Sequence, residues 1–352
     1  MPEWQSQAER AWFRSRLVPT HQRGFETPTA GGIPASGDLS FAIFIYLAIK
    51  IKQKEVNMIV GCSNSTTIAK SIARRLKKPY SKLSVVKFPD GELNIRFMDK
   101  VKGKNIVLVQ SFYNNDKTKM SINDQLIEVF LAARSAEAQG AKSVTLAAPY
   151  FPYFRQDKEF HPGECVSIKI IAHLMNLCLN RIIVIDPHLH RLKSMYDVFT
   201  IKSKRLTADP LIADYIKKKI KNAVIIGPDW ESYRWAEKTA DMIGCESATL
   251  QKTRYSARKV SVKLNKKISL KNKSVVIVDD IISTGHTILE TIKSMKRLGA
   301  KKFIVIGVHG LLVEGALSKL RKAGATVITT NTIVNSTSKI DIAPLIAGAL
   351  KK

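Results

Sequence analysis

Two distant segments of this chain follow one plan, and this internal repeat restricts the possible fold more than any other feature. Residues 139–150 (QGAKSVTLAAPY) match residues 298–309 (LGAKKFIVIGVH), and each segment follows a helical pattern and opens a strand. Upstream, the apolar strand pattern at residues 104–110 corresponds to the one at residues 273–278. A repeated unit of strand, helix and strand predicts two similar halves.

The rest of the chain alternates short apolar strands with amphipathic helices. Further strand patterns occur at residues 58–60, 181–185, 223–226 and 326–329. Further helical patterns occur at residues 67–76, 168–177, 210–220 and 233–243. This alternation predicts an α/β fold with parallel sheets flanked by helices, in which ligands bind at the carboxyl ends of the strands. We expect a first domain at residues 58–203 and a second at residues 204–347.

Residues 1–57 differ from the rest of the chain. They carry Pro, Gly, Gln and Arg without clear periodicity, and their apolar run at residues 39–49 is too short to span a bilayer. The segment also lacks the pattern of a signal peptide. We expect a disordered extension, or a natural start at Met58, and a cytoplasmic protein that does not enter a membrane.

Composition narrows the possible partners. The chain has 57 Lys and Arg residues against 29 Asp and Glu residues, and this excess of positive charge favours anionic ligands. No basic helix or aromatic-interleaved strand typical of a nucleic-acid reader is evident, so we expect no specific nucleic-acid partner. The four cysteines lack Cys-x-x-Cys spacing, which favours reduced thiols in the core over a zinc site.

The two halves differ where chemistry is expected. Asp279 and Asp280 end one strand pattern, whereas Gln110 and Ser111 stand at the matching place in the first half. Two adjacent carboxylates at a strand end are costly unless hydroxyl groups or a cation meet them. The small residues at 283–287 can turn N–H groups and hydroxyls toward a phosphate at the start of the next helix. A phosphorylated sugar is therefore the predicted ligand; the alternative is a polar turn with a helix cap.

Two motifs in the first half suggest contacts with a nucleotide. The turn at residues 88–92 (FPDGE) is acidic and near a strand end, although it could be a simple β-turn. Arg155, Gln156 and Asp157 follow an aromatic run and could hold the phosphates and base of a nucleotide. The alternative for these three residues is a solvated charge cluster in a surface loop.

Two further motifs suggest chemistry on a phosphoryl group. His188 follows a strand and lies near Asp186, which suggests a contact with a metal or a phosphate, although most histidines are structural. Lys252 and Arg254 project to the same side of an extended segment, where they could neutralise a transferring phosphoryl group. The alternative for this pair is a basic, solvated strand edge.

At residues 279–287 the chain resembles the phosphoribosyltransferase superfamily. Over residues 58–347 the motifs, taken in order and together with Asp229, resemble the ribose-phosphate diphosphokinase family in its archaeal form. The resemblance implies two tandem phosphoribosyltransferase-like domains, a Mg²⁺ cofactor and at least a homodimer. The implied enzyme serves nucleotide biosynthesis by transferring the β,γ-diphosphoryl group of MgATP to the C1 hydroxyl of ribose 5-phosphate, giving 5-phosphoribosyl 1-diphosphate and AMP.

The same resemblance implies roles for individual residues. It assigns ribose 5-phosphate binding to Asp279, Asp280, Ser283, Thr284, Gly285, His286 and Thr287. It assigns ATP binding to Phe88, Asp90, Glu92, Arg155, Gln156 and Asp157, with the first three reaching from a neighbouring subunit. It assigns catalysis to Lys252, Arg254 and His188, and metal binding to His188 and Asp229.

The chain departs from the family pattern at His286, where glycine is common. If this position needs a positive φ, the loop is strained. One alternative to the diphosphokinase is a phosphoribosyltransferase that consumes the activated sugar. Another is a catalytically silent paralogue that assembles with an active enzyme, although such a subunit has no chemical need for Lys252, Arg254, His188 and the aspartate pair. The residues leave oligomer size, allosteric regulation and the choice of donor nucleotide open.

Overall fold

The computed structural model describes residues 55–116, 118–189, 191–228, 233–254, 260–266 and 268–351. The described fold lies within the unit Gln53–Lys352. The predictions for residues 1–54 therefore lie outside the described residues. No described helix is long and apolar enough to cross a membrane.

The described chain forms two seven-stranded sheets with the same topology. The first sheet has the order β3-β2-β1-β4-β5-β6-β7 and the second has the order β10-β9-β8-β11-β12-β13-β14. The strands of the first are β1 (Met58–Gly61), β2 (Tyr80–Lys87), β3 (Leu93–Phe97), β4 (Asn105–Val109), β5 (Ser143–Ala148), β6 (Arg181–Ile185) and β7 (Lys202–Leu206). Those of the second are β8 (Ala223–Gly227), β9 (Ser247–Arg254), β10 (Val260–Leu264), β11 (Ser274–Ile282), β12 (Lys302–Gly310), β13 (Ala325–Thr330) and β14 (Ser338–Ile340). The identical order confirms the duplicated α/β plan.

Both sheets are parallel except at one edge. There, β3 pairs antiparallel with β2, and β10 pairs antiparallel with β9. The central strands are buried along their length, as expected for parallel strands covered by helices on both faces. The two edge hairpins were not predicted as strands, because polar residues alternate through them and no continuous apolar run marks them.

Helices cover the sheets on both faces. Those described are α3 (Thr66–Leu76), α4 (Ile122–Ala138), α5 (Ser167–Cys178), α6 (Asp209–Lys219), α7 (Tyr233–Ile243), α8 (His286–Arg297), α9 (Ala316–Lys322) and α10 (Ala343–Lys351), with a short 3₁₀ helix η1 (Met195–Asp197). The predicted helices at residues 67–76, 168–177, 210–220 and 233–243 agree with α3, α5, α6 and α7 to within one residue at each end.

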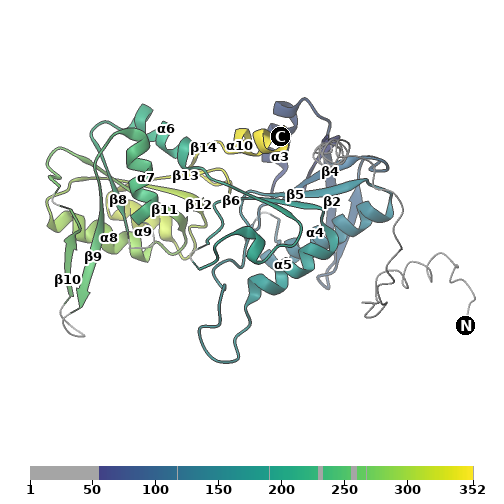
Figure 1. Ribbon diagram of the computed structural model, residues 1–352, viewed down its shortest axis with the longest axis horizontal. Helices are drawn as coiled ribbons and strands as arrows, with labels where there is room; N and C mark the ends of the chain where they lie inside the picture. Colours follow the sequence, from purple (N-terminus) through teal and green to yellow (C-terminus); the bar gives the residue numbers. More distant parts are fainter. Residues whose placement is uncertain are drawn as a thin grey trace, which may run out of the picture. The chain divides into compact units, whose positions relative to one another are not determined.

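The two halves exchange their last helices. Helix α6 follows the first sheet but packs against α7 of the second half, and α10 ends the second half but packs against α3 of the first. Figure 1 shows α10 (yellow) beside α3. One continuous apolar core accordingly includes Ile59 and Ile183 of the first half and Ile225 and Ile304 of the second. The reciprocal packing fixes the position of one half against the other.

Polar contacts reinforce this exchange of helices. Arg181 in β6 donates to the backbone carbonyl of Ala349 in α10 at 3.1 Å. Arg75 in α3 forms an ion pair with Asp341, just before α10, at 3.0 Å. Strand β7 spans the expected domain junction at residues 203 and 204, and it pairs with β6 in the first sheet.

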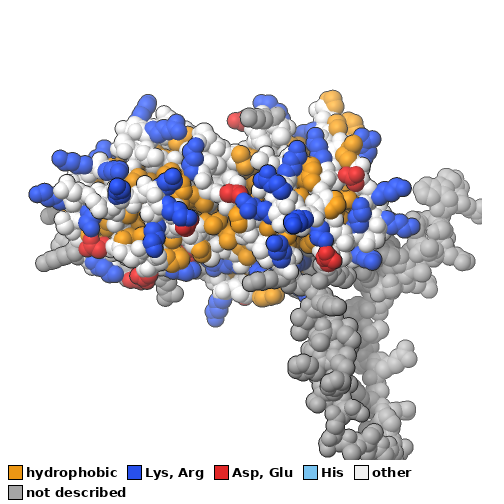
Figure 2. Space-filling view, turned by 90° about the horizontal axis from the view of Figure 1, so that it is seen from above, with side chains coloured by type: hydrophobic (Ala, Val, Ile, Leu, Met, Phe, Trp, Pro, Cys, Tyr) orange, Lys and Arg blue, Asp and Glu red, His pale blue; other side chains and the backbone are white. Residues whose placement is uncertain are grey.

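Two predictions from composition can be compared with the described structure. All four cysteines are free thiols, and Cys62 is buried as expected, but Cys165 is exposed, so the prediction of a core position is wrong for that residue. Figure 2 shows Lys and Arg side chains spread over the visible face of the molecule instead of gathered in one patch.

Candidate functional site

A cleft lies at the carboxyl end of β11, where the sequence predicts a sugar-phosphate site. Its volume is about 270 Å³, close to the lower end of the range typical of small-ligand sites. Its lining consists of Arg155, His188, Asp279, Asp280, Ile281, Ser283, Thr284, Gly285, His286, Thr287 and Ile288. The structure therefore brings together all seven residues predicted to bind ribose 5-phosphate and two predicted to act on the nucleotide.

The loop between β11 and α8 presents a helix amino end to this cleft. Gly285 caps α8 with φ of 73°, a left-handed conformation that glycine adopts without a Cβ penalty. His286 is the first residue of α8 and has no positive φ, so the strain considered for His286 is not present. No side chain of the described residues caps α8, and its first turn holds no acid. The N–H groups at this end are thus directed to the cleft, where the helix dipole favours an anion.

One contact in the cleft joins the two halves. His188, beyond β6 of the first half, lies with its Nδ1 atom 2.7 Å from Oδ2 of Asp280 in β11 of the second half. Both side chains are about one quarter exposed. The backbone N–H of Asp280 donates to Oδ1 of Asp279 at 3.1 Å, which fixes the Asp279 carboxylate against the backbone of Asp280. An imidazole and two carboxylates therefore form one continuous polar surface.

The registers of the two sheets show which first-half residues correspond to Asp279 and Asp280. Asn105 pairs with Ser143 as Ser274 pairs with Lys302, and the repeat aligns Ser143 with Lys302. Counting from this register, Gln110 and Ser111 occupy the places of Asp279 and Asp280. The structure thus confirms that the first half has an amide and a hydroxyl where the second half has carboxylates.

An internal carboxylate satisfies the polar groups at this first-half position. Glu128 of α4 accepts hydrogen bonds from the Ser63 backbone N–H at 2.8 Å, the Ser63 hydroxyl at 2.6 Å and the Gln110 amide at 2.9 Å. The Glu128 side chain is fully buried, and burial raises its pKa to about 7.

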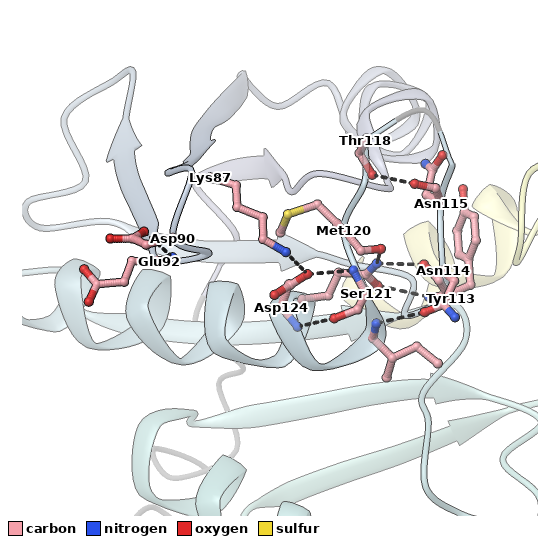
Figure 3. A network of polar contacts seen from close by, with 12 residues as sticks. Lys87, Asp90, Glu92, Tyr113, Asn114, Asn115, Thr118, Met120, Ser121 and Asp124 are labelled. Carbon is pink, nitrogen blue, oxygen red and sulfur yellow. Dashed lines mark hydrogen bonds and ion pairs between the residues drawn. The ribbon is translucent and has the colours of Figure 1, made fainter.

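The start of α4 is also satisfied internally (Figure 3). Ser121 and Asp124 form a capping box, and Lys87 of β2 contacts the Asp124 carboxylate at 2.8 Å. Hydrogen bonding to Lys87 and Ser121 holds the pKa of Asp124 below its ordinary value despite the opposing effect of partial burial. The amino end of α4 therefore has its own acid, whereas that of α8 has none.

The three residues predicted to meet ATP after the aromatic run lie in different surroundings. Arg155 is exposed and lines the cleft. Gln156 donates to Glu164 of the same loop at 3.2 Å. Asp157 is buried and accepts from Arg191 at 3.0 Å. Only Arg155 of these three belongs to the cleft lining.

The turn at residues 88–92 joins β2 to β3. The Phe88 N–H donates to the Glu92 carbonyl at 2.8 Å, and Asp90 accepts from the Glu92 N–H at 3.1 Å. Phe88 is 43% exposed, and Asp90 and Glu92 are exposed too. None of the three lines the cleft, and Figure 3 shows Asp90 and Glu92 beside α4, away from its start at Ser121 and Asp124.

The predicted catalytic pair lies on a strand. Lys252 and Arg254 belong to β9, and their backbones pair with Val262 and Val260 of β10. This extended conformation agrees with the prediction that the two project to the same side. The positions of their side chains, and the predicted metal ligand Asp229, lie outside the described residues.

Comparisons with known proteins agree with this arrangement. A family model for the N-terminal domain of ribose phosphate pyrophosphokinase matches residues 57–178, and one for the phosphoribosyl transferase domain matches residues 202–340. A ribose-phosphate pyrophosphokinase from Methanothermobacter thermautotrophicus is 36% identical over 296 residues, covering 84% of this chain and 100% of the relative. The chain belongs to the ribose-phosphate pyrophosphokinase family.

Other members of the family support the same conclusion. The ribose-phosphate pyrophosphokinase of Saccharolobus solfataricus is 36% identical over 282 residues, covering 78% of this chain and 93% of the relative. The crystal structure of phosphoribosylpyrophosphate synthetase from Mycobacterium smegmatis has a TM-score of 0.72 and 27% identity, covering 84% of this chain and 98% of that one. The predicted membership of the diphosphokinase family, an alternative name for the pyrophosphokinases, is confirmed.

Two residues beside the cleft, Tyr150 and His309, were not predicted. Tyr150 and His309 lie with their ring centroids 4.9 Å apart, and both line a small cavity that also contacts Arg155 and His188. Burial raises the pKa of Tyr150 to about 12. A signal was present, because Tyr150 and His309 end the two matching segments of the repeat. Sequence spacing does not show that these equivalent residues face each other.

Proposed function

We propose that this protein transfers the β,γ-diphosphoryl group of MgATP to the C1 hydroxyl of ribose 5-phosphate, giving 5-phosphoribosyl 1-diphosphate and AMP. The observation that carries the proposal is the contact between His188 and Asp280 inside one cleft. It joins the part of the site expected to meet ATP to the part expected to meet the sugar. A simple phosphoribosyltransferase cleft needs only the second part.

Ribose 5-phosphate binds at the loop after β11. Its phosphate accepts hydrogen bonds from N–H groups at the start of α8 and from the hydroxyls of Ser283, Thr284 and Thr287. Its ring hydroxyls donate to the carboxylates of Asp279 and Asp280. The uncapped amino end of α8 supports this orientation, because an anion there meets N–H groups that have no side-chain partner.

ATP binds toward the first half. Arg155 lies at the edge of the cleft and can pair with phosphate oxygens, and Gln156 and Asp157 adjoin it in the loop. The proposed role of Lys252 and Arg254 is to neutralise the charge that develops on the transferring group and on the departing AMP. The sugar C1 oxygen attacks the β-phosphorus, the bond from that phosphorus to the α-phosphate oxygen breaks, and the hydroxyl proton leaves to solvent or a carboxylate.

Magnesium is the proposed cofactor. Its preferred ligands are oxygen atoms, and the adjacent carboxylates of Asp279 and Asp280 in the cleft fit that preference. His188 and Asp229 are further proposed ligands on the nucleotide side. When bound, Mg²⁺ neutralises phosphate charge and orients the diphosphoryl group. Asp280 and His188 hold this side of the cleft in register through their own contact.

The active form is proposed to be at least a homodimer. The turn that carries Phe88, Asp90 and Glu92 is exposed and does not line the cleft of its own chain. The proposed role of these residues is to meet ATP bound in a neighbouring subunit. We also propose that the junction between the domains follows β7, because β7 pairs within the first sheet.

The test is phosphorus NMR of the full chain with ribose 5-phosphate, ATP and magnesium. Formation of AMP in a one-to-one ratio with 5-phosphoribosyl 1-diphosphate supports the proposal, and the signal should stop when EDTA removes the metal. Consumption of added 5-phosphoribosyl 1-diphosphate only when a nucleobase is present indicates a phosphoribosyltransferase. Binding of both substrates without turnover indicates a silent paralogue.

A further inference from the structure

We propose that His309 is a positioning residue for the transfer reaction: from the second half, it fixes the backbone segment that carries His188 in the first half. As regards turnover, the inference rests on the proposed function. His309 is 2% exposed in β12 and does not line the cleft that contains Asp280. It acts through the backbone of Asp186 and Pro187, the two residues that directly precede His188.

Asp186 has a strained backbone that needs external support. Its φ is 35°, in the left-handed region that residues other than glycine rarely adopt, and such a conformation costs about 1–3 kcal/mol. Two of its hydrogen bonds come from its own half. The Asp186 N–H donates to the Leu206 carbonyl at 2.9 Å, and the Ala208 N–H donates to the Asp186 carboxylate at 2.7 Å.

The third support comes from the other half of the protein. Nε2 of His309 lies 3.2 Å from the backbone carbonyl oxygen of Asp186. A carbonyl oxygen can only accept, so Nε2 must carry the proton and donate. Burial lowers the pKa of His309 to about 4, which leaves the ring neutral with this single N–H.

The protonation of Nε2 determines the other side of the ring. Nδ1 must then accept, and its neighbour at 3.0 Å is the hydroxyl of Thr332. The Thr332 hydroxyl also lies 2.8 Å from the Val308 carbonyl. Because the Thr330 hydroxyl lies at the same distance from that carbonyl and can donate to it, the single Thr332 proton can go to Nδ1. The Thr332 hydroxyl thus donates to Nδ1 of His309, and Nε2 of His309 donates to the carbonyl of Asp186.

This chain of hydrogen bonds ends at the proposed site. Pro187 restricts the backbone after Asp186, and the Leu189 N–H donates to the Pro187 carbonyl at 2.7 Å, which closes a tight turn around His188. In this conformation of the turn, Nδ1 of His188 lies 2.7 Å from Oδ2 of Asp280. Loss of the His309 donor would leave the buried Asp186 carbonyl without that bond and favour relaxation of its φ.

The relation between the repeats explains why this support crosses the halves. The Ser111 hydroxyl donates to the backbone carbonyl of Thr332. Ser111 is equivalent to Asp280, and counting from the register of β6 and β13, Thr332 is equivalent to Pro187, beside His188. The contact between Asp280 and His188 carries the proposed chemistry. The corresponding contact between Ser111 and Thr332 holds Thr332, and through it His309, in place.

The experiment compares two substitutions at one position in the full chain. His309→Leu keeps a similar volume without a donor, whereas His309→Gln keeps an amide nitrogen near the place of Nε2. Misplacement of a reacting group by about 1 Å can cost on the order of 100-fold. We expect kcat to fall roughly 10- to 100-fold in His309→Leu, with the KM for ribose 5-phosphate changed less than about threefold, and to recover mostly in His309→Gln.

Thr329→Val is the matched control. It removes a buried hydroxyl that pairs with Thr337 and takes no part in the His309 chain, so its kcat should stay close to that of the wild type. Equal losses in His309→Leu and His309→Gln, or in His309→Leu and Thr329→Val, would overturn the inference. If His309→Leu does not fold, Thr332→Val replaces it, with an expected loss of about 3- to 10-fold from the freed ring.

A second readout does not depend on turnover. Nitrogen-15 NMR of labelled histidine should show His309 as the neutral Nε2–H tautomer, and the ring signals of His188 should shift in His309→Leu but not in Thr329→Val. An Nδ1–H tautomer, or His188 signals unchanged in His309→Leu, would refute the positioning role. A wild type that makes no AMP but shows these signals would instead refute the proposed function and leave the positioning role standing.

Discussion

Replacement of Glu128 by glutamine should destabilise the protein at acidic pH and stabilise it at alkaline pH. Glu128 is buried in α4 and accepts three hydrogen bonds, two from Ser63 and one from Gln110. Burial raises its pKa to about 7 from an ordinary value of 4.5. The side chain is therefore more basic in the folded protein than in the unfolded chain.

The sign of the pH dependence follows from this difference. Between pH 4.5 and 7 the folded protein holds a proton on Glu128 that the unfolded chain has lost, so the free energy of unfolding falls as the pH rises. At about 1.4 kcal/mol per pH unit, the loss over this interval is roughly 3 kcal/mol. Stability from this group is fully present below pH 4.5 and lost above pH 7.

Glu128→Gln removes the ionisation and one hydrogen bond. A glutamine amide can satisfy Ser63, but its NH₂ group meets the NH₂ group of Gln110, and the lost bond costs about 1 kcal/mol. We expect the variant to be about 1 kcal/mol less stable than the wild type at pH 4.5 and about 2 kcal/mol more stable at pH 8.

Urea unfolding followed by far-UV circular dichroism at both pH values measures this change. The difference between variant and wild type isolates Glu128, because other titrating groups contribute to both proteins. Glu137→Gln, on the exposed face of the same helix, is the control and should show no reversal. A stability difference that is the same at pH 4.5 and pH 8 would refute the argument, since it would mean that Glu128 is ionised in the folded protein.

Three further predictions concern the cleft. Asp280→Asn should raise the KM for ribose 5-phosphate about 10-fold in steady-state assays at saturating ATP, because it weakens a charged hydrogen bond to the sugar; an unchanged KM would contradict the contact. Lys252→Ala should lower kcat roughly 100-fold while calorimetry finds ribose 5-phosphate bound within about threefold of wild type, and equal losses would exclude a transition-state role. Gly285→Ala should lower the free energy of unfolding by about 1–2 kcal/mol because φ is 73°, whereas Gly348→Ala, exposed within α10, should not lower it.

Much of the fold could be predicted because the central strands are buried on both faces. Burial of this kind leaves unbroken apolar runs, such as β8 and the first part of β11, and helices between them show apolar residues at helical spacing. The exchange of α6 and α10 could not be predicted. Sequence spacing shows that a helix has an apolar face but does not show which of two similar sheets it covers.

The candidate site likewise has a part that the sequence could predict and a part that it could not. Asp279, Asp280 and the loop to α8 are consecutive in the chain, so their grouping could be predicted from one motif. The approach of His188 to Asp280 depends on how the halves pack, which no local pattern encodes. The sequence could not decide whether His286 needs a positive φ. In the structure Gly285 adopts the positive φ, and α8 begins one residue later, at His286.

The two halves show how one scaffold can either close a polar site or keep it open. In the first half, the donors at the strand ends meet Glu128, and Asp124 meets the amino end of α4. Buried polar groups need partners, and here the chain supplies them, so a ligand anion has no favourable place. In the second half the carboxylates lie on the strand itself, and no described side chain caps α8. The anion that α8 favours can then be a ligand, and this asymmetry is why we propose the sugar-phosphate site for the second half.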